Sequence, residues 1–208
     1  MLTIIDYDAG NTYNVKKAFD FLGVKTRLTA DPAEILASRG LILPGVGAFA
    51  PAMQTLRTRG LDTVIKKAVM QKTPLLGICL GMQLLFESSS EYGEHKGLGL
   101  IPGKVIALPR KKGYKVPQMG WNENELIQKN SVFSFVAQQY TYFVHSFYAD
   151  CDNKYIVSRV DYSVPVPAIV QNKNVYGLQF HPEKSGNVGI KILQTFVKEI
   201  IYNDNSGN

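Results

Sequence analysis

The segment that decides the fold reads Thr73-Pro-Leu-Leu-Gly-Ile-Cys-Leu-Gly-Met-Gln-Leu-Leu-Phe86. Residues 75–78 form an apolar run that is too short for a helix and suits a strand buried on both faces. The run stops at Cys79, between Gly77 and Gly81, and residues 80–87 favour a helix. We therefore expect a strand, a sharp turn that carries the cysteine, and a helix.

Cys79 lies in a Gly-x-Cys-x-Gly arrangement, the cysteine counterpart of the Gly-x-Ser-x-Gly nucleophile elbow. A thiol at the N-terminus of a helix feels the positive end of the helix dipole, which favours the thiolate. The amide N–H of Leu80 is left free to face a developing oxyanion. Taken alone, Cys79 is better explained as a buried structural cysteine, and only the residues found elsewhere in the chain favour a nucleophile.

A cysteine nucleophile needs a base, and His181 is the best placed of the three histidines. It follows a strand-like run over residues 175–181 and is followed by Pro182 and Glu183. Residues i and i+2 of an extended chain point to the same side, so Glu183 can orient the imidazole of His181. Without Cys79 the same residues would indicate only a turn after a strand.

A third piece is the apolar run over residues 41–43, which leads into the loop Pro44-Gly-Val-Gly47. Glycines there permit the backbone N–H of Val46 or Gly47 to turn inward and supply a second oxyanion donor. On its own this loop is an ordinary turn between a strand and a helix.

Strands and helices alternate through the first half of the chain. We expect strands over residues 2–6, 24–28 and 40–43 and helices over 12–22, 33–37, 48–59 and 61–71. This alternation predicts an α/β fold with a central, mostly parallel sheet covered by helices on both faces. Ligands bind at the carboxyl ends of such strands, so Cys79, the 44–47 loop and His181 should converge.

The pattern changes over residues 97–170, where Gly and Pro separate short strands that should pair antiparallel. We expect these strands over residues 104–108, 142–148, 155–160 and 168–171. A C-terminal helix over 188–202 presents an apolar face, and residues 203–208 should fray. The 208 residues are predicted to form a single domain.

Composition excludes several classes of protein. The basic residues behind the net charge of +6 are scattered, which favours a solvated surface over nucleic-acid binding; the cluster at residues 110–112 leaves an acidic partner or a phosphorylated substrate open. There is no apolar run of about 18 residues and no secretory signal, so we expect a cytoplasmic protein without a membrane span. The two cysteines, Cys79 and Cys151, form no disulfide framework, and Cys151 is interpreted as a bystander.

Together, residues 44–47, 77–83 and 181–183 resemble the class I glutamine amidotransferases, which use a Cys-His-Glu triad. Segments 5–11, 44–49, 118–122 and 142–146 are most similar to the glutaminase subunits of the imidazole glycerol phosphate synthases. The resemblance implies the flavodoxin-like fold of that class with a small antiparallel sheet. It also implies hydrolysis of L-glutamine to glutamate and ammonia, in which Cys79 forms a glutamyl thioester, His181 passes protons and Glu183 orients His181.

The same resemblance places substrate contacts at Gly47, Gln83 and the backbone around His145 and Ser146, and it implies no cofactor and no metal. The residues themselves leave alternatives. Gln83 could be a solvated helix residue, and His145, in an apolar strand, could be a core histidine with satisfied hydrogen bonds.

A glutaminase of this size has no room for an acceptor domain, so ammonia must pass to a separate synthase. The resemblance implies a (βα)8-barrel cyclase, bound as a heterodimer, that receives ammonia through a channel. That cyclase makes imidazole glycerol phosphate and aminoimidazole carboxamide ribotide in histidine biosynthesis. The residues expected to contact the cyclase are Gly10, Asn11, Met119, Trp121, Tyr142 and Lys184. For Trp121, packing in the core is the alternative.

Two alternatives remain at this stage. Residues 8–14 depart from the pattern, because related subunits commonly have Leu and Ser where this chain has Thr12 and Asn14. The chain could therefore serve another synthase, of the surface-sugar amidine or the anthranilate type. It could also be a catalytically silent binding subunit, which the presence of Cys79, His181 and Glu183 argues against.

Overall fold

The computed structural model describes residues 1–8 and 11–202. A nine-stranded sheet has the order β2-β1-β3-β4-β13-β12-β11-β8-β9, and its first five strands run parallel. These five are β2 (Thr26–Thr29), β1 (Leu2–Ile5), β3 (Gly40–Gly45), β4 (Leu75–Cys79) and β13 (Val175–Leu178). Apart from β2 at the edge, every residue of these strands is buried, as the continuous apolar runs in the sequence predict.

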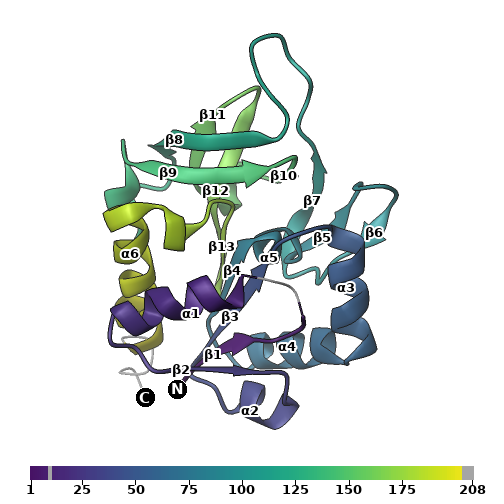
Figure 1. Ribbon diagram of the computed structural model, residues 1–208, viewed down its shortest axis with the longest axis vertical. Coiled ribbons are helices and arrows are strands. Elements are labelled where there is room, and N and C mark those ends of the chain that lie inside the picture. Colours follow the sequence, from purple (N-terminus) through teal and green to yellow (C-terminus); the bar gives the residue numbers. More distant parts are fainter. Residues whose placement is uncertain (9–10, 203–208) are drawn as a thin grey trace.

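The other four strands extend the same sheet with antiparallel neighbours. They are β12 (Pro165–Asn172), β11 (Ile156–Asp161), β8 (Gln118–Leu126) and β9 (Tyr140–His145). Burial alternates along β8 and β9, so one face of this part of the sheet is open to solvent. Figure 1 shows these strands at the end of the molecule opposite α2 (Pro32–Leu36).

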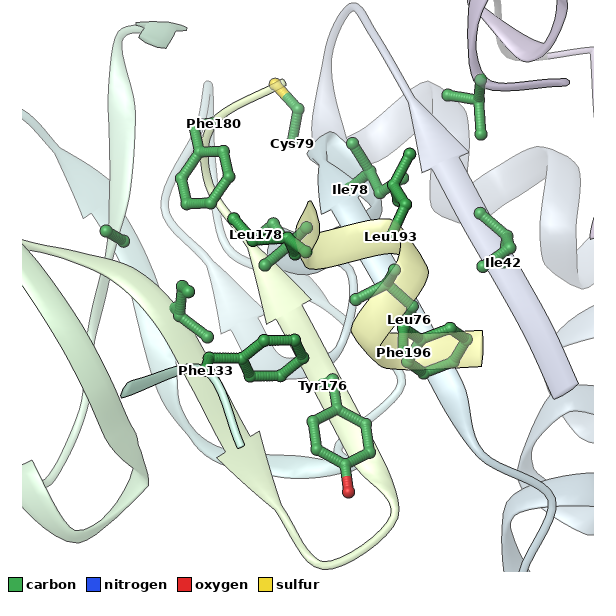
Figure 2. Packing of buried hydrophobic residues seen from close by; sticks show 14 of the residues in the cluster. Ile42, Leu76, Ile78, Cys79, Phe133, Tyr176, Leu178, Phe180, Leu193 and Phe196 are labelled. Atoms are coloured by element: carbon green, nitrogen blue, oxygen red, sulfur yellow. The ribbon is translucent and has the colours of Figure 1, made fainter. Parts of the chain in front are cut away.

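Helices cover both faces of the parallel strands. On one face, α1 (Thr12–Phe21), α6 (Gly186–Thr195) and the π-helix Phe196–Tyr202 pack on the sheet. Figure 2 shows Leu193 and Phe196 against Leu76 of β4. On the other face, α2, α3 (Phe49–Thr58) and α4 (Leu61–Met70) enclose a second buried cluster. The expected parallel sheet between two helical layers is therefore confirmed.

A small sheet lies beside this core, with the order β10-β7-β5-β6. Its strands are β10 (Phe147–Asp150), β7 (Ile101–Ala107), β5 (Phe86–Ser89) and β6 (His95–Lys96). The pairs β10–β7 and β5–β6 are antiparallel, whereas β5 and β7 run parallel. Short 3-10 helices span Ser134–Val136, Asn153–Tyr155 and Pro182–Lys184.

Two local predictions need correction. The helix expected over residues 80–87 is the single turn α5 (Leu80–Gln83), and Phe86 instead begins β5, where it pairs with Ile101. Long-range pairing thus overrides the helical preference of this segment. The strand expected over 142–148 is divided at Ser146, so that β9 belongs to the large sheet and β10 to the small one.

Other boundaries differ more modestly. The strand expected over 24–28 begins only at Thr26, because residues 22–24 still belong to the turn that closes α1. Strands β6 and β8 were not predicted. Within the described residues, no helix has the length and apolar content needed to cross a membrane.

Candidate active site

The turn after β4 presents Cys79 in a conformation that is unusual for a residue with a side chain, with φ 55° and ψ −112°. The two flanking glycines allow α5 to pack directly on the sheet. A Cβ on Gly81 would lie 1.8 Å from the Leu43 carbonyl oxygen, and one on Gly77 would lie 2.6 Å from the Gly81 carbonyl oxygen. The expected strand, turn and helix are present, and the elbow holds its strain because backbone contacts enclose it.

His181 follows β13, the strand next to β4, and meets Cys79 at the carboxyl ends of the two strands. Its Nδ1 lies 2.8 Å from Oε1 of Glu183, and both side chains are 2% exposed. The backbone N–H of His181 donates to the Tyr142 carbonyl oxygen at 3.0 Å, which ties this turn to β9. Cys79 and His181 therefore lie together at the edge where the strand order places them, and Glu183 lies beside His181.

The pKa values of His181 and Glu183 are shifted by the groups around them. Burial by itself would lower the pKa of His181, but hydrogen bonds with Cys79 and Glu183, and their charges, raise it to about 9. Burial would raise the pKa of Glu183, whereas the hydrogen bond and charge of His181 and the Asn11 side chain lower it. This arrangement favours the imidazolium form of His181 beside the ionised carboxylate of Glu183.

A cavity of about 350 Å³ opens over the thiol. The residues that line it are Val46, Gly47, Cys79, Leu80, Gln83, Glu91, Pro117, Val144, His145, Ser146, Phe147 and His181. All of the predicted oxyanion and substrate residues are among them. A cavity of about 540 Å³ between Met1, Arg39 and Val197 is larger, but no cysteine, serine, histidine or carboxylate lines it, so we assign the candidate site by its reactive groups and not by its volume.

The loop after β3 borders the cavity. Gly47 has φ 99°, a conformation that favours glycine. The buried hydroxyl of Tyr7 donates to the Pro44 carbonyl oxygen at 2.7 Å, and a Cβ on Gly45 would lie 2.6 Å from that hydroxyl. Tyr7 thus fixes the start of the loop, a contact that the sequence did not predict because it joins residues far apart in the chain.

The family model described as Glutamine amidotransferase class-I matches residues 3–200. The chain belongs to the class I glutamine amidotransferases. The family predicted from the motifs is thereby confirmed.

Two relatives of this amidotransferase carry the name Imidazole glycerol phosphate synthase subunit HisH. The protein of Lactiplantibacillus plantarum is 57% identical over 208 residues, which are 100% of both chains. That of Listeria innocua is 51% identical over 200 residues, 96% of each chain. Among solved structures, a glutamine amidotransferase aligns with a TM-score of 0.74 at 18% identity, covering 96% of this chain and 98% of its own, which shows the shared fold.

Gln83 of this amidotransferase is not a solvated helix residue. It is 5% exposed, and its Nε2 donates to the Phe147 carbonyl oxygen at 2.9 Å and to Oε1 of Gln179 at 3.1 Å. Since both N–H groups are used inside the protein, its carbonyl oxygen is the atom available to a ligand.

His145 is buried beside the same cavity. Its Nδ1 lies 2.8 Å from the Phe147 carbonyl oxygen, so Nδ1 carries the proton, and Nε2 has no hydrogen-bond partner among the described residues. Burial lowers its pKa to about 4, and the nearby charge of His181 acts in the same direction. His145 is therefore neutral near pH 7, and the interpretation as a fully satisfied core histidine holds for only one of its nitrogens.

Four of the residues expected to bind a partner share one face near the cavity. Met119 is 64% exposed and Trp121 53% exposed on β8, so core packing does not explain Trp121. Trp121 pairs with Tyr142 of β9 with ring centroids 6.0 Å apart, and Nζ of Lys184 lies 6.0 Å from the Tyr142 ring centroid. We call Met119, Trp121, Tyr142 and Lys184 the aromatic face.

The other two residues predicted to bind a partner, Gly10 and Asn11, do not belong to the aromatic face as it is defined here. Gly10 lies outside the described residues. Asn11 contacts the candidate triad, because its Nδ2 donates to Oε1 of Glu183. Glu91 was not predicted from the sequence, although it lines the cavity and its carboxylate accepts from the Phe49 backbone N–H at 2.7 Å. A carboxylate 12 positions after the cysteine carries no local motif that would have revealed it.

Proposed function

We propose that this chain is the glutaminase subunit of an imidazole glycerol phosphate synthase, which hydrolyses L-glutamine and passes the ammonia to a cyclase subunit. The observation that carries this proposal is the buried array of Cys79, His181 and Glu183 at the base of a cavity. The 57% identity to a subunit of that name, over the whole length of both chains, supports the choice of synthase.

In the first step the Cys79 thiolate attacks the carbon of the glutamine side-chain carboxamide. The carbonyl electrons move to oxygen, and the resulting oxyanion is stabilised by the Leu80 backbone N–H and by an N–H of Val46 or Gly47. The C–N bond then breaks as the His181 imidazolium gives its proton to the leaving nitrogen, which departs as ammonia. Cys79 is left as a glutamyl thioester.

In the second step water attacks the thioester carbon. The now neutral His181 takes a proton from that water through the nitrogen that faces Cys79, because Nδ1 is held by Glu183. The C–S bond breaks, and glutamate and the thiolate are released. Glu183 stays ionised throughout and stabilises the imidazolium that forms again.

Two residues of the cavity are suited to the amino-acid end of glutamine. Glu91 supplies a carboxylate for the α-ammonium group, and the carbonyl oxygen of Gln83 can accept from the same group. The backbone at His145 and Ser146 also lines the cavity and can meet the α-carboxylate. This arrangement selects an α-amino acid with a terminal carboxamide.

We place the cyclase on the aromatic face. Val144 lines the cavity and pairs across the ladder with Met119, so this face continues directly from the reaction site. Exposed aromatic and methionine side chains beside a lysine are typical of a protein interface. Docking there would cover the mouth of the cavity and keep ammonia from solvent.

We also propose a cytoplasmic location. Cys79 and Cys151 are both free cysteines, and a nucleophilic thiol persists best where the surroundings keep thiols reduced.

The test is glutamate release from glutamine by the purified chain, measured with and without the cyclase and a phosphoribulosyl ligand. Strong stimulation by the liganded cyclase is expected, with no release by Cys79→Ala and normal release by the matched variant Cys151→Ala. Activity that ignores the cyclase would redirect the search to another synthase. No release in any mixture, with Cys79 shown to be reduced, would favour a silent binding subunit.

A further inference from the structure

Asn11 connects the start of α1 to the catalytic carboxylate. Its Nδ2 donates to Oε1 of Glu183 at 2.5 Å, and the same oxygen lies 2.8 Å from Nδ1 of His181. Nδ2 of Asn11 is itself 3.5 Å from that His181 nitrogen. A single carboxylate oxygen therefore receives two donors, one from the base and one from a residue 172 positions away in the sequence.

The orientation of the Asn11 amide is determined by its neighbours. Nδ2 of Asn14 donates to Oδ1 of Asn11 at 2.8 Å, which occupies the amide oxygen. An ionised carboxylate can only accept hydrogen bonds, so the group turned toward Glu183 must be the NH₂. Both contacts select the same amide orientation, and together they place the NH₂ group on Oε1.

The backbone of Asn11 is also specialised. With φ 73° and ψ 7° it adopts the left-handed conformation immediately before α1. Asn tolerates this conformation better than other residues with side chains, apart from Asp. From this position the short side chain reaches Glu183. The backbone conformation and the amide of Asn11 therefore both contribute to the hydrogen bond with Glu183.

We propose that Asn11 is a positioning residue for glutamine hydrolysis, which holds Oε1 of Glu183 where it orients His181. The inference rests on the proposed roles of Cys79, His181 and Glu183. Asn11 acts through Glu183 and does not touch glutamine. Its loss should therefore slow the chemical steps, lowering kcat, while the KM for glutamine changes less than twofold.

Two variants separate this role from a role in the turn. Asn11→Gly accepts the left-handed conformation and removes the amide, whereas Asn11→Asp keeps the size and this tolerance but replaces the N–H donor with an oxygen. Lys173→Gly is the matched control, because Lys173 has φ 54° in an exposed turn between β12 and β13. A hydrogen bond to a charged group is worth enough for kcat to fall about tenfold or more in both Asn11 variants.

A second readout does not require glutamine hydrolysis. Iodoacetamide alkylates Cys79, and the rate reports how well the neighbouring His181, oriented by Glu183, activates this thiol. At pH 7.5 the alkylation rate should fall at least threefold in Asn11→Gly, with Cys79→Ser as the background control. If the wild-type complex released no glutamate, the proposed function would fail, yet this arm would still test the positioning of Glu183.

Slower alkylation and a lower kcat in both Asn11 variants, with the thermal midpoint within a few degrees of wild type, would support the proposal. Wild-type alkylation and kcat in Asn11→Gly would overturn it, since the turn alone would then suffice. The proposal would also be overturned if KM rose while kcat was kept, or if Lys173→Gly lost kcat to the same extent.

Discussion

At the scale of single residues, the site depends on backbone contacts that only glycine permits and on one buried set of charges. Gly81 and Gly77 let α5 lie against β3 and β4, which holds Cys79 in its unusual conformation. His181 and Glu183 are almost completely buried, so their charges act at short range with little screening by solvent. The glycine contacts and the buried charges should therefore both affect the free energy of unfolding.

Gly81→Ala should destabilise the protein more than Gly47→Ala. A Cβ on Gly81 would lie 1.8 Å from a backbone oxygen, so β3 or α5 must move, and we expect a loss of several kcal/mol in the free energy of unfolding. Gly47 has no atom within 4 Å of such a Cβ, and its φ of +99° alone predicts a loss of about 1–3 kcal/mol. Urea unfolding measures both.

Gly60→Ala is the matched control for Gly47→Ala, because Gly60 also has positive φ and open space around it. It should lose about 1–2 kcal/mol of stability and keep kcat. Gly47→Ala should lose kcat as well, since its peptide borders the thiol. Equal kcat in the two variants would separate Gly47 from the oxyanion loop.

Stability should depend on pH through His181. Its folded pKa of about 9 exceeds the unfolded value of 6.5, so its contribution is complete below about pH 6.5 and is lost as pH rises through 9. The full shift corresponds to about 3 kcal/mol. The lowered pKa of Glu183 has the opposite sign: its contribution is present above the unfolded value of 4.5 and is lost as pH falls further.

Glu183→Gln tests this expectation, because it removes one of the groups that raise the pKa of His181. Urea unfolding of wild type and variant at pH 6.5, 7.5 and 9 should give a difference in stability that shrinks by about 1–2 kcal/mol between pH 6.5 and 9. A difference that stays constant over this range would contradict the assigned coupling of His181 and Glu183.

At the scale of elements, the antiparallel pair of β8 and β9 contributes both to the core around the cavity and to the exposed aromatic face. Their inward residues pack in the core or line the cavity, and their outward residues form most of the aromatic face. Val144 faces the same side of this ladder as Met119 and Trp121 and also lines the cavity, so the candidate site borders the proposed docking surface. We therefore expect a partner bound at Met119 of β8 to lie one ladder pair from the cavity, which Val144 lines.

Trp121→Ala should weaken binding of the cyclase about 100-fold, because a large, half-exposed aromatic residue at the centre of a face is typical of an interface hot spot. The dissociation constant can be measured by calorimetry. Met70→Ala, at an apolar residue that is 73% exposed at the end of α4, is the matched control and should bind normally. Equal affinity of both variants would move the interface away from the aromatic face.

At the scale of the whole molecule, one sheet joins the two helical layers and the antiparallel extension. Both buried clusters include residues of the parallel strands, and the cluster around α1 and α6 also includes residues of β11 and β12. A core shared in this way predicts one cooperative unfolding unit, although the chain combines parallel and antiparallel halves.

Trp121 offers a direct test of this cooperativity, since it is the single tryptophan and lies on β8 in the antiparallel half. Its fluorescence and the far-ultraviolet circular dichroism of the whole chain should change at the same urea concentration. Circular dichroism that persisted after the fluorescence change would mean that the parallel half unfolds as a separate unit.

The sequence by itself determined the central parallel strands, the elbow at Cys79 and the pairing of His181 with Glu183. Buried strands appear as continuous apolar runs, and residues two apart on an extended chain face the same side, so local sequence carries this information. The convergence of Cys79, the 44–47 loop and His181 followed from one rule, that parallel strands end at a common edge.

Only the tertiary structure decided that Phe86 begins a strand, that Ser146 divides two sheets, and that Asn11 reaches Glu183. Each of these depends on a partner far away in the chain, such as Ile101 for Phe86 or Glu183 for Asn11. The helical preference of residues 84–87 was outweighed because pairing with β7 satisfies the backbone of Phe86 while its side chain enters the core. Contacts of this kind form only when the whole chain has folded, so no local sequence pattern predicts them.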